Sequence, residues 1–198
     1  MLYVGRMVRE KGAHVLVEAA PLVLAQAPMT RFVLAGGGNT DGLQARARAL
    51  GVASRVHLPG FVSETELRWL YHVAAAAVYP SLYEPFGIVA LEAMAARVPV
   101  VTSDIGGLVE VVRHRETGLH TWANNPDSLA WGILQVLQDP ALARRLCAEG
   151  ARVAREEYNW DAIAEKTLQV YAEVLAPRRA PRRRPAARTP SVTRDGAL

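Results

Sequence analysis

The sequence predicts an α/β protein with a doubly wound parallel sheet. Short β-branched runs alternate with longer stretches of helical period along residues 1–176. The short runs are almost continuously apolar, as expected for parallel strands that helices cover on both faces. Right-handed crossovers between successive strands then place helices on both sides of one sheet.

Five strands are expected, each followed by a helix. They are "MLYVG" (1–5), "RFVLAG" (31–36), "RVHLPG" (55–60), "AAAVYP" (75–80) and "VPVVTS" (98–103).

Two helix starts are well marked. Ser63 with Glu66 forms a capping box, and Pro126 with Asp127 opens a long apolar-periodic stretch. Apolar residues at helical spacing over 159–175 predict a last helix that closes the fold.

Composition indicates one compact domain, residues 1–176, followed by a tail. The chain has 198 residues, 51% of them hydrophobic, which suits a domain with a core of its own. The single cysteine, Cys147, excludes a disulfide framework and favours a reducing compartment. Every apolar run falls short of the ~20 residues needed to cross a bilayer. A cytoplasmic protein is therefore expected.

The tail, residues 177–198, carries the basic charge of the chain. It holds seven arginines and one aspartate, so subtracting its +6 from the formal net charge of +4 leaves residues 1–176 at −2. A Pro/Arg/Ala tract without apolar period cannot offset the entropy of ordering, so a disordered, solvated tail is expected. The alternative is weak electrostatic contact with an anionic membrane or with nucleic acid, which would put the protein at the membrane periphery in the first case. No specific nucleic-acid partner is expected.

Ligands of open parallel sheets bind where strands end and loops enter helices. Arg6 and Lys11 lie in the loop after the first strand, either as solvated loop charges or as ligands of an anion. This loop is not a P-loop, because Lys11 is followed by Gly12 rather than by Ser or Thr. The glycines at 36–38 do not complete a dinucleotide fingerprint either, because Asp41 takes the place of the third glycine.

The stretch "FGIVALEAMAA" (86–96) predicts a helix whose first turn could hold an anion. Gly87, Ile88 and Val89 would occupy that turn, where backbone N–H groups lack partners within the helix. Gly87 also lacks the side chain that would block a phosphate or a sugar. A similar start recurs at 104–107, so two helix N-termini could face one cleft.

Glu84 and Glu92 flank this helix start. Glu84 precedes the helix and Glu92 lies about five residues inside it, so the two are separated by more than a helical turn. That separation does not suit one acid–base pair, whereas each carboxylate could accept two hydrogen bonds from a separate diol. Glu92 could instead be an exposed or salt-bridged helix residue, but in so apolar a stretch it is expected to need a partner.

No metal site is predicted. The five histidines are scattered without metal-ligand spacing, and the sequence has no Asp-x-Asp pair. The four tryptophans, Trp69, Trp122, Trp131 and Trp160, fall in strand or helix patterns and are expected to pack in the core or at its edge.

Several stretches together resemble the donor-binding, C-terminal half of retaining glycosyltransferases of the GT-B architecture, which is built from two Rossmann-like domains. They are "YVGRMVREKG", "FVLAGGG", "HLPGFVS", "YPSLYEPFGIVALEAMAARVPVVTSDIGGLVEVV" and "YNWDAIAEKTLQVYAEVL". The group 1, or family 4, hexosyltransferases are especially similar, and the Glu-x7-Glu element within P-S-x-x-E-P-F-G is the most specific motif. The resemblance covers residues 1–176 and implies a Rossmann-like fold.

The resemblance also implies a donor substrate, a UDP-, GDP- or ADP-linked sugar, and no cofactor. Arg6 and Lys11 would bind the diphosphate in place of a metal ion. Glu84 would hold hydroxyls of the hexose, and Glu92 those of the ribose. Arg6, Lys11 and Glu84 are thus the implied catalytic residues. Backbone amides of Phe86, Gly87, Ile88 and Val89 would contact the sugar and the diphosphate. The turn at Gly36 and Gly37 would let the nucleotide approach, and Phe61 and Val62 would border the base.

The implied reaction is hexosyl transfer to an acceptor hydroxyl with retention of anomeric configuration. Similar enzymes carry an N-terminal domain that binds the acceptor, which here is a glycan, a lipid or a small molecule. That domain is absent from this sequence, so a separate domain or partner subunit is expected. The final helix would normally cross back to it, and here it would either expose apolar surface or pack against a partner. The alternatives are a nucleotide-sugar binding module or inactive fragment without turnover, and a phosphorylase or epimerase of the same architecture.

Overall fold

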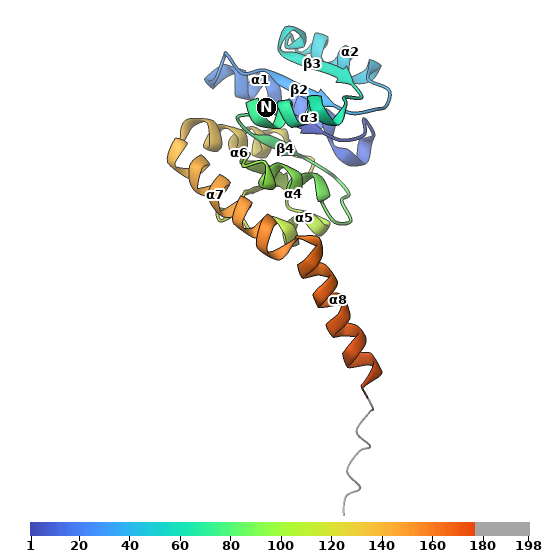
Figure 1. The fold of residues 1–198 in the computed structure, drawn as a ribbon. Helices are drawn as coiled ribbons and strands as arrows, with labels where there is room; N and C mark the ends of the chain where they lie inside the picture. Colours follow the sequence, from blue (N-terminus) through green and yellow to red (C-terminus); the bar gives the residue numbers. More distant parts are fainter. Residues whose placement is uncertain (177–198) are drawn as a thin grey trace, which may run out of the picture. The chain divides into compact units, whose positions relative to one another are not determined.

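A computed structural model describes residues 1–176 of the chain, and the contacts among them divide the chain after Ile163. The first unit, Met1–Ile163, is an α/β domain (Figure 1). The residues of the last helix from Ala164 onward belong to a second unit. The predicted disordered tail at 177–198, with its membrane contact, lies outside the described residues.

Within the described residues, six parallel strands form one sheet in the order β3-β2-β1-β4-β5-β6. The chain winds outward from the central β1–β4 pair in both directions, so the predicted doubly wound sheet is confirmed. The carboxyl ends of β1 and β4 meet where the winding reverses, which is where open α/β sheets bind ligands. The strands are β1 (Leu2–Val4), β2 (Phe32–Ala35), β3 (Val56–Gly60), β4 (Ala77–Tyr79), β5 (Val100–Ser103) and β6 (Leu119–Thr121).

The sixth strand, β6, was not predicted. It pairs with β5 through Val101↔Leu119, Thr102↔His120 and Ser103↔Thr121. Its three residues alternate, with a half-buried histidine between two buried residues, so the sequence lacks the apolar run that marks the other strands. An edge strand needs less apolar character because a single neighbour pairs with it.

Helices cover both faces of the sheet. Alternate strand residues point to opposite faces, so Val78 lies in one core cluster and Tyr79 in the other. Helices α1, α2 and α6 contribute to the first cluster, α3, α4 and α5 to the second, and α7 to both. The helices are α1 (Ala13–Gln26), α2 (Asp41–Ala49), α3 (Glu64–Val73), α4 (Ile88–Ala95), α5 (Gly106–Val111), α6 (Pro126–Gln138), α7 (Pro140–Glu157) and α8 (Trp160–Leu175), with 3₁₀ turns η1 (Arg9–Lys11) and η2 (Ala53–Arg55).

Both predicted helix starts are confirmed. Ser63 and Glu66 form a reciprocal capping box at the start of α3. Pro126 is the first residue of α6, and the Asn125 side chain caps that helix.

The last helix, α8, has no buried residue. The prediction that it closes the fold was therefore wrong, because an apolar stripe identifies an amphipathic helix without identifying what packs on it. The apolar surface expected from the resemblance is present, on Leu168, Val170, Tyr171, Val174 and Leu175. None of the helices in residues 1–176 combines the length and the apolar character needed to cross a membrane.

Of the two locations expected for the tryptophans, the core or its edge, the core was wrong for all four. Trp69, Trp122, Trp131 and Trp160 are 65%, 70%, 42% and 84% exposed. Residue type alone misled the prediction, because an indole suits a partly wet surface site as well as a core edge.

Candidate functional site

The loops that follow β1 and β4 are held together through their backbones. The N–H groups of Leu82 and Tyr83 both donate to the carbonyl of Glu10, at 2.7 and 3.1 Å. Gly12, at φ +70°, lies so close to the second loop that a Cβ there would be 1.8 Å from the carbonyl oxygen of Pro80. Only glycine fits this contact. The loop after β1 is thereby fixed against the loop that carries Glu84.

This docking brings Lys11 and Glu84 together. Lys11 Nζ lies 2.7 Å from Glu84 Oε2, and Ser81 Oγ donates to the same oxygen at 3.4 Å. Glu84 is only 8% exposed, so its charge has little access to water and depends on these partners. Both charged residues were predicted, but the sequence did not indicate that they pair.

The start of α5 contacts the backbone of the loop that carries Glu84 and holds it in place. The Gly107 N–H donates to the Glu84 carbonyl at 2.9 Å, and a Cβ on Gly106 would lie 2.2 Å from that oxygen. The second helix N-terminus that could have faced the cleft thus has one of its N–H groups engaged inside the protein. Its role in the structure is to fix the loop.

A cavity of about 210 Å³ opens at the ends of β1 and β4, beside the start of α4. Gly87 precedes α4 at φ +100°, and the first hydrogen bond of the helix runs from the Ala90 N–H to the Gly87 carbonyl. The N–H groups of residues 87–89 therefore lie before that bond and lack partners within the helix. The predicted residues that line this cavity are Lys11, Glu84, Phe86, Gly87, Ile88 and Val89.

Tyr3 and Ser81 also line this cavity and were not predicted. Burial, and to a smaller extent the charge of Glu84, raises the pKa of Tyr3, so its phenol is neutral. The Tyr3 hydroxyl donates to the carbonyl of Arg6 at 3.0 Å and so fixes the loop after β1. Ser81 had a usable sequence signal, since it shares the short loop with Glu84. Tyr3 had no such signal, because a tyrosine within an apolar strand is typical of a core residue.

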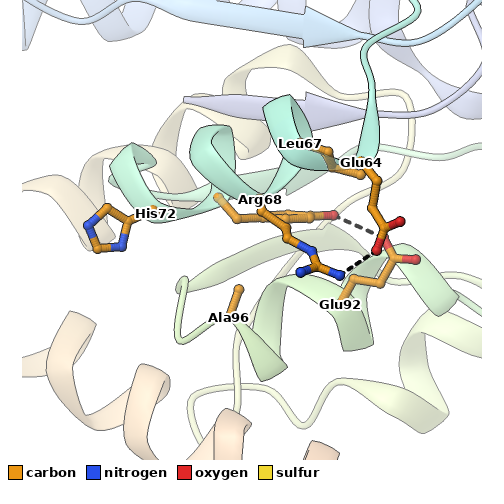
Figure 2. Close-up of a pocket in the computed structure, with 7 residues that line it drawn as sticks. Glu64, Leu67, Arg68, His72, Glu92 and Ala96 are labelled. Carbon is orange, nitrogen blue, oxygen red and sulfur yellow. Dashed lines mark hydrogen bonds and ion pairs between the residues drawn. The ribbon is translucent and has the colours of Figure 1, made fainter.

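Glu92 lines a different cavity, of about 500 Å³, between α3 and α4. Figure 2 shows Glu92 of α4 beside the ion-paired Glu64 and Arg68 of α3. Glu92 is exposed, and its Oε2 accepts a hydrogen bond from the Tyr71 hydroxyl at 3.2 Å. The partner that Glu92 was expected to need is therefore a phenol and not a cation.

The hydrogen bond from Tyr71 to Glu92 is the last of two consecutive hydrogen bonds. Tyr71 and Tyr79 are buried and their hydroxyl oxygens are 3.2 Å apart. Burial raises the pKa of both phenols, so each is neutral with a single proton to donate. Since Tyr71 gives its proton to Glu92, Tyr79 must be the donor to Tyr71. Neither tyrosine was predicted, because nothing in the sequence separates them from ordinary core residues.

Five predicted residues line neither cavity: Arg6, Gly36, Gly37, Phe61 and Val62. Arg6 is exposed in the loop after β1, and Phe61 is 86% exposed after β3. Gly36 packs against that first loop, since a Cβ there would lie 1.9 Å from the Gly5 carbonyl oxygen, whereas Gly37 faces open space. Across residues 1–176, no group of three or more His, Cys, Asp or Glu side chains is placed to hold a metal ion.

Comparison with known sequences shows the family to which the chain belongs. Residues 1–153 match the family model described as glycosyl transferases group 1. An uncharacterized glycosyltransferase of Methanocaldococcus jannaschii and a glycogen synthase of Mycobacterium tuberculosis are each 42% identical to the chain over 172 residues. The alignments cover 86% of this chain but only 44% and 42% of those proteins.

Solved structures show the same fold. Sucrose-phosphate synthase from Thermosynechococcus elongatus superposes with a TM-score of 0.78 at 37% identity, over 88% of this chain and 45% of that one. Anabaena Alr3699/HepE, solved in complex with UDP-glucose, superposes with a TM-score of 0.77 at 25% identity, over 87% of this chain and 48% of that one. The chain thus spans less than half the length of these relatives and has the Rossmann-like fold of GT-B glycosyltransferases. It belongs to the group 1 family of glycosyl transferases.

Proposed function

We propose that this chain binds a nucleotide-diphosphate sugar and forms the donor half of a retaining hexosyltransferase. The observation that carries the proposal is the Lys11–Glu84 ion pair. It lies beside the start of α4, at the carboxyl ends of β1 and β4, where the strand order reverses. A cation, a carboxylate and unpartnered helix N–H groups line one small cavity there. Diphosphate and sugar hydroxyls are the groups that such a set of donors and acceptors recognises.

The diphosphate would bind between Lys11 and the first turn of α4, with Arg6 in the adjoining loop. As the sugar–phosphate bond breaks, negative charge grows on the leaving diphosphate. Fixed cations and helix N–H groups stabilise that charge without having to reorient, so we propose a reaction that needs no metal ion. Binding would also draw Lys11 away from Glu84, which frees the Glu84 carboxylate for the sugar.

Glu84 would then accept hydrogen bonds from hexose hydroxyls, with Ser81 holding it in place. Glu92, oriented by Tyr71, would accept from the ribose, and its cavity gives room for the nucleoside. The hexose would pass through an oxocarbenium-like state and be taken by an acceptor hydroxyl on the face that the diphosphate leaves. The acceptor would bind to a separate domain or partner subunit in the cytoplasm. Two relatives support the proposal: Alr3699/HepE, solved with UDP-glucose, and the glycogen synthase.

The test is calorimetric titration of the chain with UDP, GDP and ADP, and then with glucose, mannose and N-acetylglucosamine conjugates of the nucleotide that binds. We expect one nucleotide to bind saturably and Lys11→Met to weaken it by about 100-fold, since the charged contact is lost and the carboxylate remains. Lys166→Met, the same change at the only other lysine, is the matched control. The proposal fails if no nucleotide binds, or if both variants bind like the wild type.

A second readout separates catalysis from binding. The bound donor should slowly release free hexose to water, and Glu84→Gln should abolish the release while nucleotide binding persists. NMR of the first-formed sugar anomer tests retention. Binding without any release from the wild type would support a binding module instead.

A further inference from the structure

A third cavity, of about 450 Å³, lies at the edge of the sheet beside β6 and the start of α6. It is separate from both cavities described above and lies within the first unit of the chain. In the sheet order, β6 is two strands from β4, or about 10 Å at ordinary strand spacing. The donor-site proposal makes no use of it.

Two of the four tryptophans of the chain line this cavity. Trp122, directly after β6, is 70% exposed, and Trp131, on α6, is 42% exposed. The backbone around Trp122 is fixed: its own N–H donates to Ser128 Oγ at 2.9 Å, and the next N–H donates to Asp104 Oδ1 at 3.1 Å. The exposed indole is therefore carried by an ordered turn, which limits the entropy that a ligand must remove on binding.

The polar residues of the cavity retain unused hydrogen-bonding groups. Asn125 Oδ1 caps α6 by accepting the Ser128 N–H at 2.8 Å, which leaves the Asn125 amide NH₂ as a donor. His114 Nδ1 accepts the His120 N–H at 2.9 Å, so the proton of the neutral ring is on Nε2, a second donor. The side chain of Asp127 makes no hydrogen bond or ion pair with any described residue, so its carboxylate is a free acceptor.

We propose that this cavity is a binding site for the pyranose rings of an oligosaccharide. A pyranose ring has apolar C–H faces that pack on an indole and a rim of hydroxyls that needs donors and acceptors, and the cavity offers both. An anionic ligand does not fit, because no lysine or arginine lines the cavity and Asp127 does. A wholly apolar ligand would bury the Asp127 carboxylate and the Asn125 amide without partners. The site would hold a glycan at the edge of the domain independently of the nucleotide.

The test is a titration of the full chain with maltohexaose and with cellohexaose, without nucleotide, followed by tryptophan fluorescence and calorimetry. Either glycan should give a saturable response, and Trp122→Ala should weaken it by at least about tenfold, as expected for a central aromatic contact. Trp122→Phe, which keeps an aromatic face, should restore most of the affinity. Trp69→Ala is the matched control, since Trp69 is similarly exposed, at 65%, but lies on α3 outside the cavity.

The proposal is overturned if neither glycan binds, or if Trp122→Ala binds as tightly as the wild type does. Thermal unfolding of each variant confirms that it is folded, which is expected because the replaced indole is exposed. Lys11→Met should bind the glycan normally. Failure of this site and failure of the donor site are therefore separate results.

Discussion

Glu84 and Glu92 belong to one sequence motif, but the fold gives them different kinds of partner. Glu84 is 8% exposed and pairs with the Lys11 ammonium from a loop 73 residues away. Glu92 is exposed and accepts a hydrogen bond from the neutral phenol of Tyr71. The difference teaches that the same residue type can be given two kinds of support. In the proposed donor site, an arriving diphosphate would draw the charged partner away from Glu84, whereas the phenol beside Glu92 carries no charge to compete for and would only orient the carboxylate.

The supports of the two carboxylates differ as well. Glu84 depends on the docking of two loops, whereas Glu92 depends on the packing of α3 and α4 around buried tyrosines. Changes can therefore be chosen that damage one support and leave the other intact.

The largest effect is expected from Gly12→Ala, which disturbs the loop contact that supports Glu84 and leaves the support of Glu92 intact. The new Cβ meets the Pro80 carbonyl, so the loop that carries Lys11 must move away. We expect the free energy of unfolding to fall by about 3 kcal/mol, measured by urea denaturation, and nucleotide binding to be lost. Gly42→Ala, at a helical site with nothing within 4 Å of the new atom, is the control and should be neutral or slightly stabilising. Equal results for the two variants would show that the loops are not held by this contact.

The next effect is that of Lys11→Met, which leaves the Glu84 carboxylate buried without its cation. We expect a loss of about 2 kcal/mol in the free energy of unfolding. The double variant with Glu84→Gln should cost less than the sum of the two single changes, because the stranded charge is gone. Additive costs would mean that the pair contributes nothing as a pair.

A smaller effect is expected on the Glu92 side. Tyr71→Phe removes the donor to Glu92 and leaves the Tyr79 hydroxyl without its acceptor. We expect nucleotide affinity to fall about fivefold, since a hydrogen bond of this kind contributes about 1 kcal/mol, while the Lys11–Glu84 pair is unaffected. Tyr171→Phe, at an exposed position of α8, should leave calorimetric binding unchanged. A Tyr71→Phe variant with wild-type affinity would remove Tyr71 from the donor site.

The smallest effect is expected at His114. It concerns how the stability of the folded domain depends on pH, and it involves neither Glu84 nor Glu92. Partial burial, followed by electrostatic interaction with His120 and Arg115, lowers the pKa of His114. The unfolded chain then binds this proton more tightly than the folded chain does, so stability falls as the pH drops below about 6.5. His114→Gln should flatten this part of a stability–pH curve measured by urea denaturation. An unchanged slope would assign it to another group.

Much of the fold was predictable because buried parallel strands leave continuous apolar runs, and the Glu84 motif was visible as two carboxylates around a helix start. The pairing of Lys11 with Glu84 was not predictable, because it follows from the contact of Gly12 with Pro80, and a sequence does not show which loops touch. The series of hydrogen bonds from Tyr79 through Tyr71 to Glu92 was missed for a related reason. Buried phenols and apolar residues obey the same periodicity, and only the folded geometry shows where a hydroxyl points.

The contact of His114 with β6 also bears on how the molecule behaves in a crowded solution. An edge strand offers unpaired backbone groups to which a strand of another molecule can add. The imidazole of His114 already accepts the His120 N–H, and so occupies a donor that an incoming chain would use. Once protonated, that ring cannot accept a hydrogen bond, and the same donor becomes available. Acid strong enough to protonate the folded ring would then open this edge to intermolecular strand pairing.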